Sequence, residues 1–274
     1  MKSASQTQAL SKYLPVRSNG KYGYIDQDGR IVIKPQFDDA HIFNEDLAAV
    51  NINDLWGFID RDGRMMIKPQ FDDAYVFNED FAGVCVNNLW GYIDRTGKMT
   101  IKAQFDDAFV FNEGLAAVNI NNQWGFIDRT GKVVIKLQFG SVSSFCDGLA
   151  SAQLGDKHGY IDQTGEFVVK PQFDEAYRFK QDLAATQVGK FHGYIDQTGE
   201  FAIKPQFENA LDFNEGFAGV QVRGKWGYID RTGKMIIQPQ FDEAFDFSGG
   251  LAKVALGDKF GYINPDGRYI WRLQ

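Results

Sequence analysis

Short apolar runs alternate with polar, turn-forming residues along the whole chain. Within residues 81–114, the run FAGVCV is followed by Asn87-Asn88 and then by the alternating run WGYID. A β-strand directs successive side chains to opposite faces, so Trp90 and Tyr92 share one face. Asparagine tolerates left-handed backbone and favours tight hairpins. The pattern predicts two antiparallel strands joined by a hairpin turn.

A second turn and a third strand follow. The D-R-T-G turn ends at Gly97, where glycine supplies positive φ while the aspartate accepts backbone N–H bonds. The predicted strand 98–102 ends at a position that carries proline in five of seven copies, which indicates a strand end or a sheet edge. The F-D-x-A-x-x-F stretch at 105–111 is expected to be either a short fourth strand or a packed connection.

This order of elements recurs eight times at a spacing of 34 residues. The glycine of a G-[YF]-I-[DN] motif marks each copy, at Gly23, Gly57, Gly91, Gly125, Gly159, Gly193, Gly227 and Gly261. A fixed period without insertions indicates one copied and stacked unit. We expect residues 1–12 to be an N-terminal extension or cap and residues 13–274 to be a single repeat array. Its units begin near residues 13, 47, 81, 115, 149, 183, 217 and 251.

The pattern predicts an all-β protein, because no window shows sustained helical spacing of apolar residues. Each unit reads as a β-meander that is stabilised by stacking on its neighbours. We expect eight such units to stack as an open superhelical β-solenoid, because the last unit ends without F-D-x-A-x-x-F and both ends are atypical, as in capped arrays. The alternative is a closed eight-bladed β-propeller.

Composition excludes several classes of protein. A net charge of -7 argues against a nucleic-acid partner, which requires a basic stripe. No apolar run reaches the ~18 residues of a membrane helix, and the polar N-terminus does not resemble a signal peptide, so we expect a cytoplasmic monomer. Cys85 and Cys146 occupy different positions of the repeat, which predicts incidental thiols in a reducing compartment.

No catalytic or metal-binding motif is present. The chain has no H-E-x-x-H, C-x-x-C, P-loop or G-x-S-x-G pattern, so we expect no enzymatic activity and no cofactor. His158 and His192 occupy equivalent positions in adjacent units and could bind a metal. They replace tryptophan in an aromatic column, however, and no third ligand shares that position. We therefore expect no metal site.

Two repeated columns form a candidate interaction surface. It comprises the aromatic positions Tyr75, Phe109 and Tyr177 and the acidic positions Asp73, Asp107 and Glu175. The acids are either a solvated face or a docking strip for a basic partner. The aromatic column is either loose packing or a row that binds a peptide or a sugar face.

The fourth unit breaks the repeat at residues 137–145, where LQFGSVSSF lacks the proline, both acids and the alanine. We interpret this break as the junction of two duplication blocks. A functional notch at the junction is an alternative that no residue pattern supports.

The motifs WGFID, WGYID, KWGYID, GLA-x-V and KPQFD-x-A-x-x-F resemble those of bacterial WG-repeat proteins, also called KWG repeats, over about residues 13–274. Tyr22, His158, His192 and Phe260 depart from the family by replacing its tryptophan. The resemblance implies a β-rich repeat used for interaction, without shared enzymatic residues. We therefore expect a non-enzymatic protein-interaction or scaffold module whose protein or peptide partner is unknown. The alternative is a carbohydrate- or small-ligand-binding protein.

Overall fold

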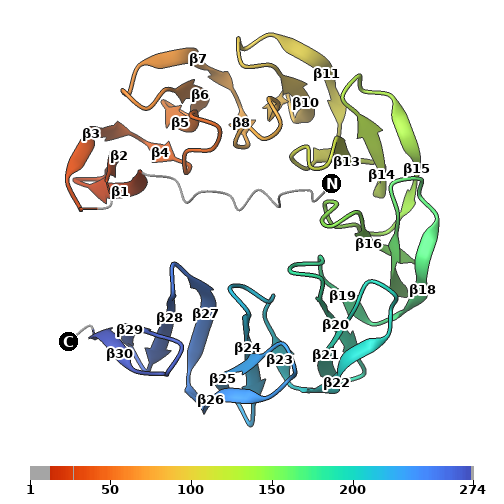
Figure 1. Ribbon diagram of the computed structural model, residues 1–274. Coiled ribbons are helices and arrows are strands. Elements are labelled where there is room, and N and C mark those ends of the chain that lie inside the picture. Colours follow the sequence, from red (N-terminus) through yellow and green to blue (C-terminus); the bar gives the residue numbers. More distant parts are fainter. Residues whose placement is uncertain (1–12, 27, 273–274) are drawn as a thin grey trace, which may run out of the picture. The chain divides into compact units, whose positions relative to one another are not determined.

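The computed structural model describes residues 13–26 and 28–272, and every regular element in these ranges is a β-strand (Figure 1). The all-β prediction is therefore confirmed. The predicted extension or cap at residues 1–12 lies outside the described residues. The chain divides into two compact units. The first comprises residues up to 122 together with 126–137, and the second comprises 123–125 together with residues from 138 onward.

One sheet of the first unit shows how a repeat folds. It contains β8 (Asp73–Ala74), β9 (Ala82–Val86), β10 (Leu89–Ile93) and β11 (Met99–Phe105), hydrogen-bonded in that order with antiparallel neighbours. The F-D-x-A stretch is thus a strand of two residues, and it pairs with the strand that follows it. Each four-stranded sheet consequently takes its first strand from the end of the preceding 34-residue sequence unit.

The other sheets of the first unit repeat this plan. Their strands are β1 (Leu14–Ser18), β2 (Lys21–Ile25) and β3 (Ile31–Phe37), then β4 (Asp39–Ala40), β5 (Ala48–Ile52), β6 (Leu55–Ile59) and β7 (Met65–Phe71). A further sheet, which lies mostly in this unit, contains β12 (Asp107–Ala108), β13 (Leu115–Ile120), β14 (Gln123–Asp128) and β15 (Val133–Phe139).

The second unit contains four sheets in its described residues. The strands are β16 (Ala150–Leu154), β17 (Lys157–Ile161) and β18 (Phe167–Phe173); β19 (Glu175–Ala176), β20 (Ala184–Val188), β21 (Phe191–Ile195) and β22 (Phe201–Phe207); β23 (Asn209–Ala210), β24 (Phe217–Val222), β25 (Lys225–Asp230) and β26 (Met235–Phe241); and β27 (Glu243–Ser248), β28 (Leu251–Leu256), β29 (Lys259–Ile263) and β30 (Tyr269–Arg272). The sheet β16-β17-β18 contains only three strands.

The hydrophobic core lies between adjacent sheets within each unit. In the first unit, Phe58 of one sheet packs edge-on against Phe77 at a centroid distance of 4.8 Å, and both are buried with Val84 and Ile93 of the next sheet. In the second unit, Tyr194 packs in the same way against Phe213 at 4.7 Å. Neighbouring sheets are therefore joined by side chains, as we expected for the large residues of each repeat.

This topology corrects the prediction of an open β-solenoid. Each described sheet is hydrogen-bonded only within itself, and neighbouring sheets of one unit meet through side chains. Small four-stranded antiparallel sheets that meet through side chains are blades of β-propeller type. The described chain contains eight such sheets, two of them three-stranded, which fits the eight-bladed propeller that we gave as the alternative.

The glycine of the W-G motif lies opposite a bulge in the outermost strand. Between the pairs Trp90–Phe105 and Tyr92–Ile101, one residue of β10 faces three of β11. A Cβ atom on Gly91 would lie 2.6 Å from the Ile101 carbonyl oxygen, so only glycine fits. The repeated prolines lie at the same bulge, inside β3, β7, β18, β22 and β26. Their predicted position at a sheet edge is confirmed, and the alternative of a strand end is wrong.

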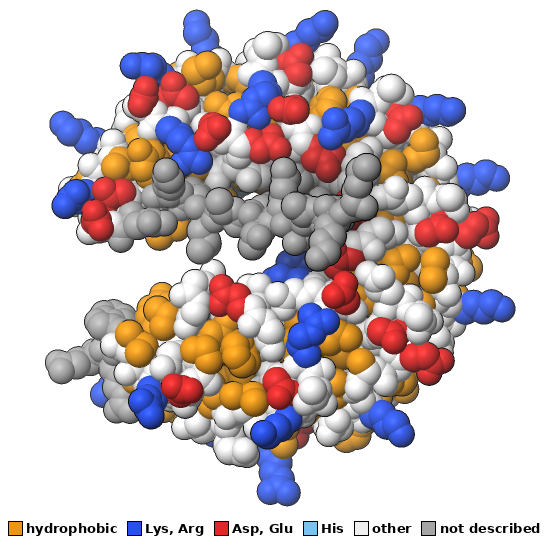
Figure 2. Space-filling view, viewed as in Figure 1, with side chains coloured by type: hydrophobic (Ala, Val, Ile, Leu, Met, Phe, Trp, Pro, Cys, Tyr) orange, Lys and Arg blue, Asp and Glu red, His pale blue; other side chains and the backbone are white. Residues whose placement is uncertain are grey.

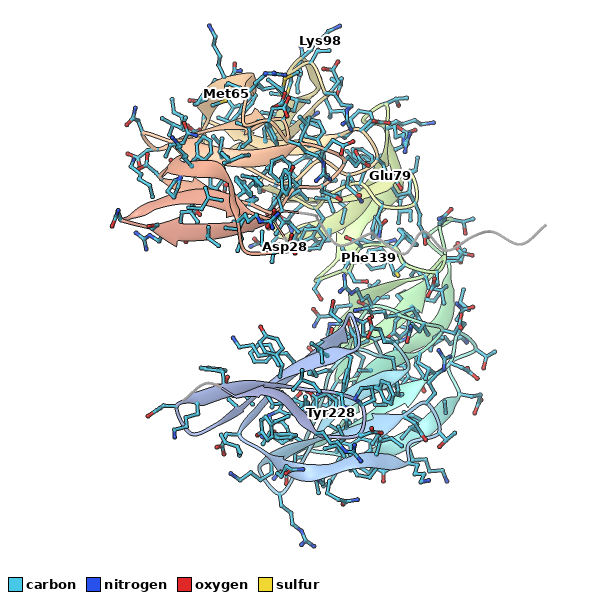
Figure 3. The ribbon with its side chains drawn as sticks, turned by 60° about the vertical axis from the view of Figure 1, so that its left-hand side comes forward. Asp28, Met65, Glu79, Lys98, Phe139 and Tyr228 are labelled. Carbon is cyan, nitrogen blue, oxygen red and sulfur yellow. The ribbon has the colours of Figure 1, made fainter. Side chains whose placement is uncertain are left out.

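The N-E turn at residues 44–45, 78–79 and 214–215 links neighbouring sheets through side chains. Asn78 Nδ2 donates to the Phe111 carbonyl at 2.6 Å. Glu79 accepts from the Gly114 N–H at 2.9 Å and pairs with Arg129 at 2.9 Å (Figure 3). These contacts reach 33 to 50 residues along the chain, so one turn is linked to the next repeat and to the one after it.

Charged side chains of both signs are interspersed over the face seen in Figure 2, with Lys and Arg projecting farthest. Several pairs are exposed, such as Arg64 and Asp62 at 2.9 Å. Exposed pairs contribute little to stability. The fold is therefore maintained by the apolar layers between sheets and by the turn links.

Candidate ligand-binding cleft

In the regular repeats, the variable aromatic column packs on the tryptophan column. Tyr75 stacks on Trp90 with a centroid distance of 4.4 Å and an interplanar angle of 12°, and His41 packs on Trp56 at 4.6 Å. Tyr75 is half-buried; burial first, and then the charge of Asp107, raise its pKa to about 12. In these repeats a ring fills the space above the tryptophan.

The fourth repeat keeps the backbone pairing of this region. Gly140 N–H donates to the Gln153 carbonyl at 3.0 Å, and Ser143 N–H donates to the Ser151 carbonyl at 3.0 Å. The equivalent bonds of a regular repeat, from Asp72 to Cys85 and from Tyr75 to Gly83, measure 3.0 and 2.9 Å. The sequence break at residues 137–145 therefore changes side chains while the backbone course is retained.

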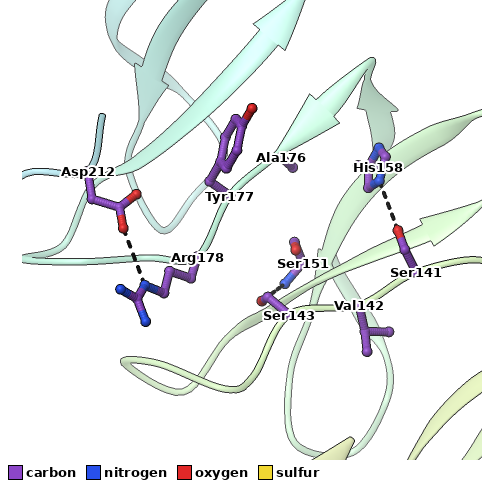
Figure 4. Close-up of a pocket in the computed structure, with 9 residues that line it drawn as sticks. All are labelled: Ser141, Val142, Ser143, Ser151, His158, Ala176, Tyr177, Arg178 and Asp212. Atoms are coloured by element: carbon purple, nitrogen blue, oxygen red, sulfur yellow. Dashed lines mark hydrogen bonds and ion pairs between the residues drawn. The ribbon is translucent and has the colours of Figure 1, made fainter. Parts of the chain in front are cut away.

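Serine and histidine replace the stacked rings in this repeat, and an open cleft of about 300 Å³ lies there (Figure 4). Ser143 stands where Tyr75 stands in a regular repeat, and His158 stands where Trp90 stands. All residues of the cleft belong to the second unit. Its walls and rim include Ser141, Ser143, His158, Tyr177, Arg178 and Asp212.

Hydrogen bonds fix the polar wall of the cleft. His158 Nδ1 lies 3.0 Å from the Asp174 carbonyl oxygen, and Nε2 lies 3.1 Å from Ser141 Oγ. A carbonyl can only accept, so Nδ1 carries the proton. The single Ser141 hydroxyl proton is then shared between His158 Nε2 and Gln153 Oε1, which lies 3.2 Å from Ser141 Oγ. Ser143 Oγ accepts from Ser151 N–H at 3.0 Å, so this side chain is held against the backbone.

The opposite wall carries an aromatic ring and an ion pair. Tyr177 donates its hydroxyl to Glu175 at 2.6 Å, and burial first and this bond second raise the tyrosine pKa to about 12. Arg178 Nε lies 3.3 Å from Asp212 Oδ2. The rim therefore presents both charges, and Asp212 is the less exposed partner.

A second ion pair of the second unit involves Asp246, which is the repeat equivalent of Asp212. Lys180 Nζ lies 3.5 Å from Asp246 Oδ2, and burial raises the pKa of this aspartate.

The acids of the first unit make local structural contacts. Asp73 and Asp107 each accept the N–H of the following alanine, at 2.7 and 2.8 Å. The preceding acid of each pair, such as Asp72, accepts the N–H of a hairpin turn residue, here Asn87 at 2.6 Å. Through these bonds the acidic column stabilises the backbone of the short strands and of the hairpin turns. Whether the column also docks a partner stays a prediction.

The six predicted surface residues are not gathered at one site. Tyr75, Phe109, Asp73 and Asp107 lie in the first unit, where the Phe109 carbonyl accepts the Tyr92 hydroxyl at 2.7 Å. Tyr177 and Glu175 lie in the second unit and contact each other, and Tyr177 alone lines the cleft. The remaining cleft residues were not among the predicted surface residues. The signal that could have identified them was the break of the repeat together with the change from tryptophan to histidine.

The two histidines considered as metal ligands make equivalent hydrogen bonds. His192 Nδ1 lies 3.2 Å from the Glu208 carbonyl, as His158 does from Asp174. Within the described residues, no group of three or more His, Cys, Asp or Glu side chains is placed to hold a metal ion. The described part of the chain also contains no apolar helix long enough for a bilayer crossing.

Solved structures share this fold at low sequence identity. A crystal structure of the eukaryotic initiation factor is 13% identical with a TM-score of 0.67, and 97% of this chain and 85% of that chain are covered. Hsv2p of Kluyveromyces lactis is 11% identical with a TM-score of 0.53, at coverages of 86% and 97%. Such identities indicate a common fold and nothing more.

Comparison with curated proteins finds no significant match. The family model described as "WG containing repeat" matches residues 22–56, 56–90, 90–124, 124–157, 159–190, 193–226 and 226–260. These seven consecutive matches span most of the chain and agree with the period of the sequence motifs. The protein therefore belongs to the WG-repeat family.

Proposed function

We propose that this repeat protein is a non-enzymatic interaction module and that the cleft of the second unit binds a segment of a partner protein. The observation that supports this most is the fourth repeat, in which the backbone bonds are kept while the ring-filling side chains are replaced. An aromatic pair contributes about 0.5–1.5 kcal/mol beyond its burial, so an unfilled position lowers stability. Binding of a ligand in the open position would explain why this loss of stability is retained.

The cleft favours binding over chemistry. The Ser141–His158 contact at 3.1 Å resembles a nucleophile and its base, but the third partner is a backbone carbonyl, which orients the imidazole without the charge that stabilises an imidazolium in a triad. Gln153 also lies 3.2 Å from Ser141 Oγ. We assign these groups to positioning and recognition. Covalent labelling of Ser141 by a fluorophosphonate probe would contradict this assignment.

A protein segment fits the cleft better than a sugar does. The rim presents Arg178 and Asp212 as an ion pair, which matches the mixed charge of a peptide. The net charge of -7 favours a basic partner at long range. We further propose that the protein acts as a monomer in the cytoplasm, where its two thiols, Cys85 and Cys146, remain reduced.

Selection of displayed peptides tests this function. A library of short random peptides is panned on the wild-type protein and counter-selected on a doubly substituted variant, Ser143→Tyr with His158→Trp, which restores the regular stack. The control is Tyr75→Phe, which keeps a ring in a regular repeat. Enriched peptides should bind the wild type and the control, and they should not bind the doubly substituted variant, in which the added rings fill the cleft. Equal binding to all three proteins, or no enrichment, would refute the proposal.

The sugar-binding alternative predicts a different result. Saturable binding on a glycan array that the filled variant abolishes would replace the proposed peptide ligand with a carbohydrate.

A further inference from the structure

Resting on the proposed function, we infer that the cleft recognises an unmodified tyrosine side chain of the partner segment. The ring would lie on the His158 imidazole, and the hydroxyl would donate to Ser141 Oγ. Three features of the second unit, compared with the regular repeats, lead to this assignment.

The first feature is the position of the ring. In a regular repeat, Tyr75 occupies the space above Trp90 with its ring nearly parallel, at 12°. At the equivalent place Ser143 is turned to the backbone, where Ser151 N–H and the Ser144 carbonyl are its partners at 3.0 and 3.1 Å. The imidazole of His158 lines the cleft, and the space that a ring fills in the regular repeats is open beside it. Aromatic rings pack favourably with ring centroids about 4.5–7 Å apart.

The second feature is a hydrogen-bonding group at the expected position of the hydroxyl. In the next repeat, the Tyr177 hydroxyl reaches Glu175, two residues earlier on the same strand end, at 2.6 Å. The residue two positions before Ser143 is Ser141. In that repeat the Tyr177 ring lies tilted against His192, with a centroid distance of 6.3 Å and an interplanar angle of 39°. A guest ring in the corresponding position against His158 therefore directs its hydroxyl toward Ser141 Oγ.

Ser141 can serve as the acceptor for this hydroxyl. Its single proton is directed to His158 Nε2 and to the Gln153 amide oxygen, and the imidazole donates from Nδ1 to the Asp174 carbonyl. The lone pairs of Ser141 Oγ are then oriented to accept a phenolic O–H. Phenylalanine would leave this acceptor without a donor, so the site should prefer tyrosine by about fivefold, the effect of one neutral hydrogen bond.

The third feature is the charge around the cleft, which disfavours a phosphorylated ring. Arg178, which lines the cleft, is already paired with Asp212, and Glu175 is already engaged by Tyr177. A phosphate of nearly two negative charges would lie near both carboxylates and would lose the donor that Ser141 accepts. The assigned ligand is therefore neutral tyrosine.

The chain suits a direct spectroscopic test, because it contains only three histidines, His41, His158 and His192. Imidazole resonances of the full chain are followed by NMR during titration with N-acetyl-L-tyrosinamide, and then with the phenylalanine and leucine amides. We expect a saturable ring-current shift of His158, about fivefold weaker binding of the phenylalanine amide, and no shift with leucine. The His41 signal should not move.

Variants of the cleft separate recognition from a change in folding. Ser143→Tyr fills the ring position and should abolish the His158 shift, while the matched variant Ser143→Ala leaves the position open and should retain it. Ser141→Ala should make the tyrosine and phenylalanine amides bind equally. The melting temperature of each variant verifies that it is folded.

The outcomes distinguish this inference from the proposed function. If selected peptides bind the cleft while N-acetyl-L-tyrosinamide leaves His158 unshifted, the tyrosine assignment is overturned and the interaction module stands. A His158 shift with methyl glucoside but not with the tyrosine amide would assign the cleft to a sugar. If O-phospho-tyrosine binds more tightly than tyrosine, the charge argument is wrong and the assignment falls with it.

Discussion

The buried tyrosine hydroxyls between the sheets offer the most direct test of how the repeat is stabilised. Tyr92 is fully buried, and its hydroxyl donates to the Phe109 carbonyl at 2.7 Å. The same column holds phenylalanine at Phe58 and Phe126, which are equally buried. Tyr92→Phe should therefore keep the packing and remove only the hydrogen bond.

The magnitude follows from that single bond. A neutral hydrogen bond contributes about 0.5–1.5 kcal/mol, and leaving a buried carbonyl without a donor costs about 1–3 kcal/mol. We expect Tyr92→Phe to lower the free energy of unfolding by about 1–2 kcal/mol. The cost stays below the upper limit because small shifts of the structure give the Phe109 carbonyl a partial replacement for the lost donor. The reverse substitution, Phe58→Tyr, supplies a donor to the Tyr75 carbonyl, the equivalent acceptor, and should stabilise the protein by up to about 1 kcal/mol.

Urea unfolding of the three proteins measures the difference. Repeat sheets can unfold separately, so native-state hydrogen exchange in the first unit should accompany the global curve. An unchanged stability of Tyr92→Phe, together with a loss of stability in Phe58→Tyr, would show that packing and not the hydroxyl determines this column.

Three further predictions concern the turns and the acidic column. Gly97 lies at φ +85°, and a Cβ atom there would approach Ile67 Cγ2 to 3.0 Å. Gly97→Val should therefore lower the free energy of unfolding by about 1 kcal/mol or more, and an unchanged melting temperature would contradict the predicted strain. Changing Asp73, Asp107 and Glu175 to Asn or Gln should weaken binding of a basic peptide and flatten its salt dependence with little loss of stability, and normal binding by this variant would leave the column a solvated face. Thr96 and the turn backbone lower the pKa of Asp94. The stability that this carboxylate contributes is therefore complete above the unfolded pKa of about 3.9 and is lost as the pH falls through the lower folded pKa. If the urea midpoint shifts equally between pH 7 and pH 3 in the wild type and in Asp94→Asn, this reasoning is refuted.

The local turns could be predicted from the sequence because their signals are local. Asn87 and Asn88 adopt φ of 52° and 63° in the predicted hairpin, and Gly97 ends its turn with positive φ as expected. Asp94 accepts from the N–H groups of Thr96 and Lys98, as the D-x-T-G pattern indicates. Each of these interactions lies within four residues, so the residue types alone determine it.

The assignment of strands to sheets was not predictable in the same way. β8 is only two residues long, which is too short for any periodicity, and its partner β9 begins eight residues after it ends. The alternation of Trp90 and Tyr92 satisfies both a solenoid and a propeller, because both bury one strand face. What distinguishes the two predicted folds is whether the row of sheets is open or closed, and a pattern that is repeated in every unit does not encode that choice locally.

The cleft was not predictable from the sequence for a related reason. Arg178 and Asp212 are separated by 34 residues and meet because adjacent sheets pack face to face. Ser141 and Ser143 are individually common surface residue types. Only comparison with the equivalent positions of other repeats shows that a ring is missing there, and the change from tryptophan to histidine at His158 also fits a metal ligand or a simple departure from the repeat.

The details of the fourth repeat argue against random loss of a repeat motif. Random loss would leave polar atoms without partners and would disturb the strand pairing. Instead, Ser141 and His158 bond to each other, Ser143 bonds to the backbone, and the pairing between residues 140–143 and β16 is retained. These substitutions open one position, satisfy their own polar groups and keep most of the pairing with β16, and the proposed binding site rests on this combination.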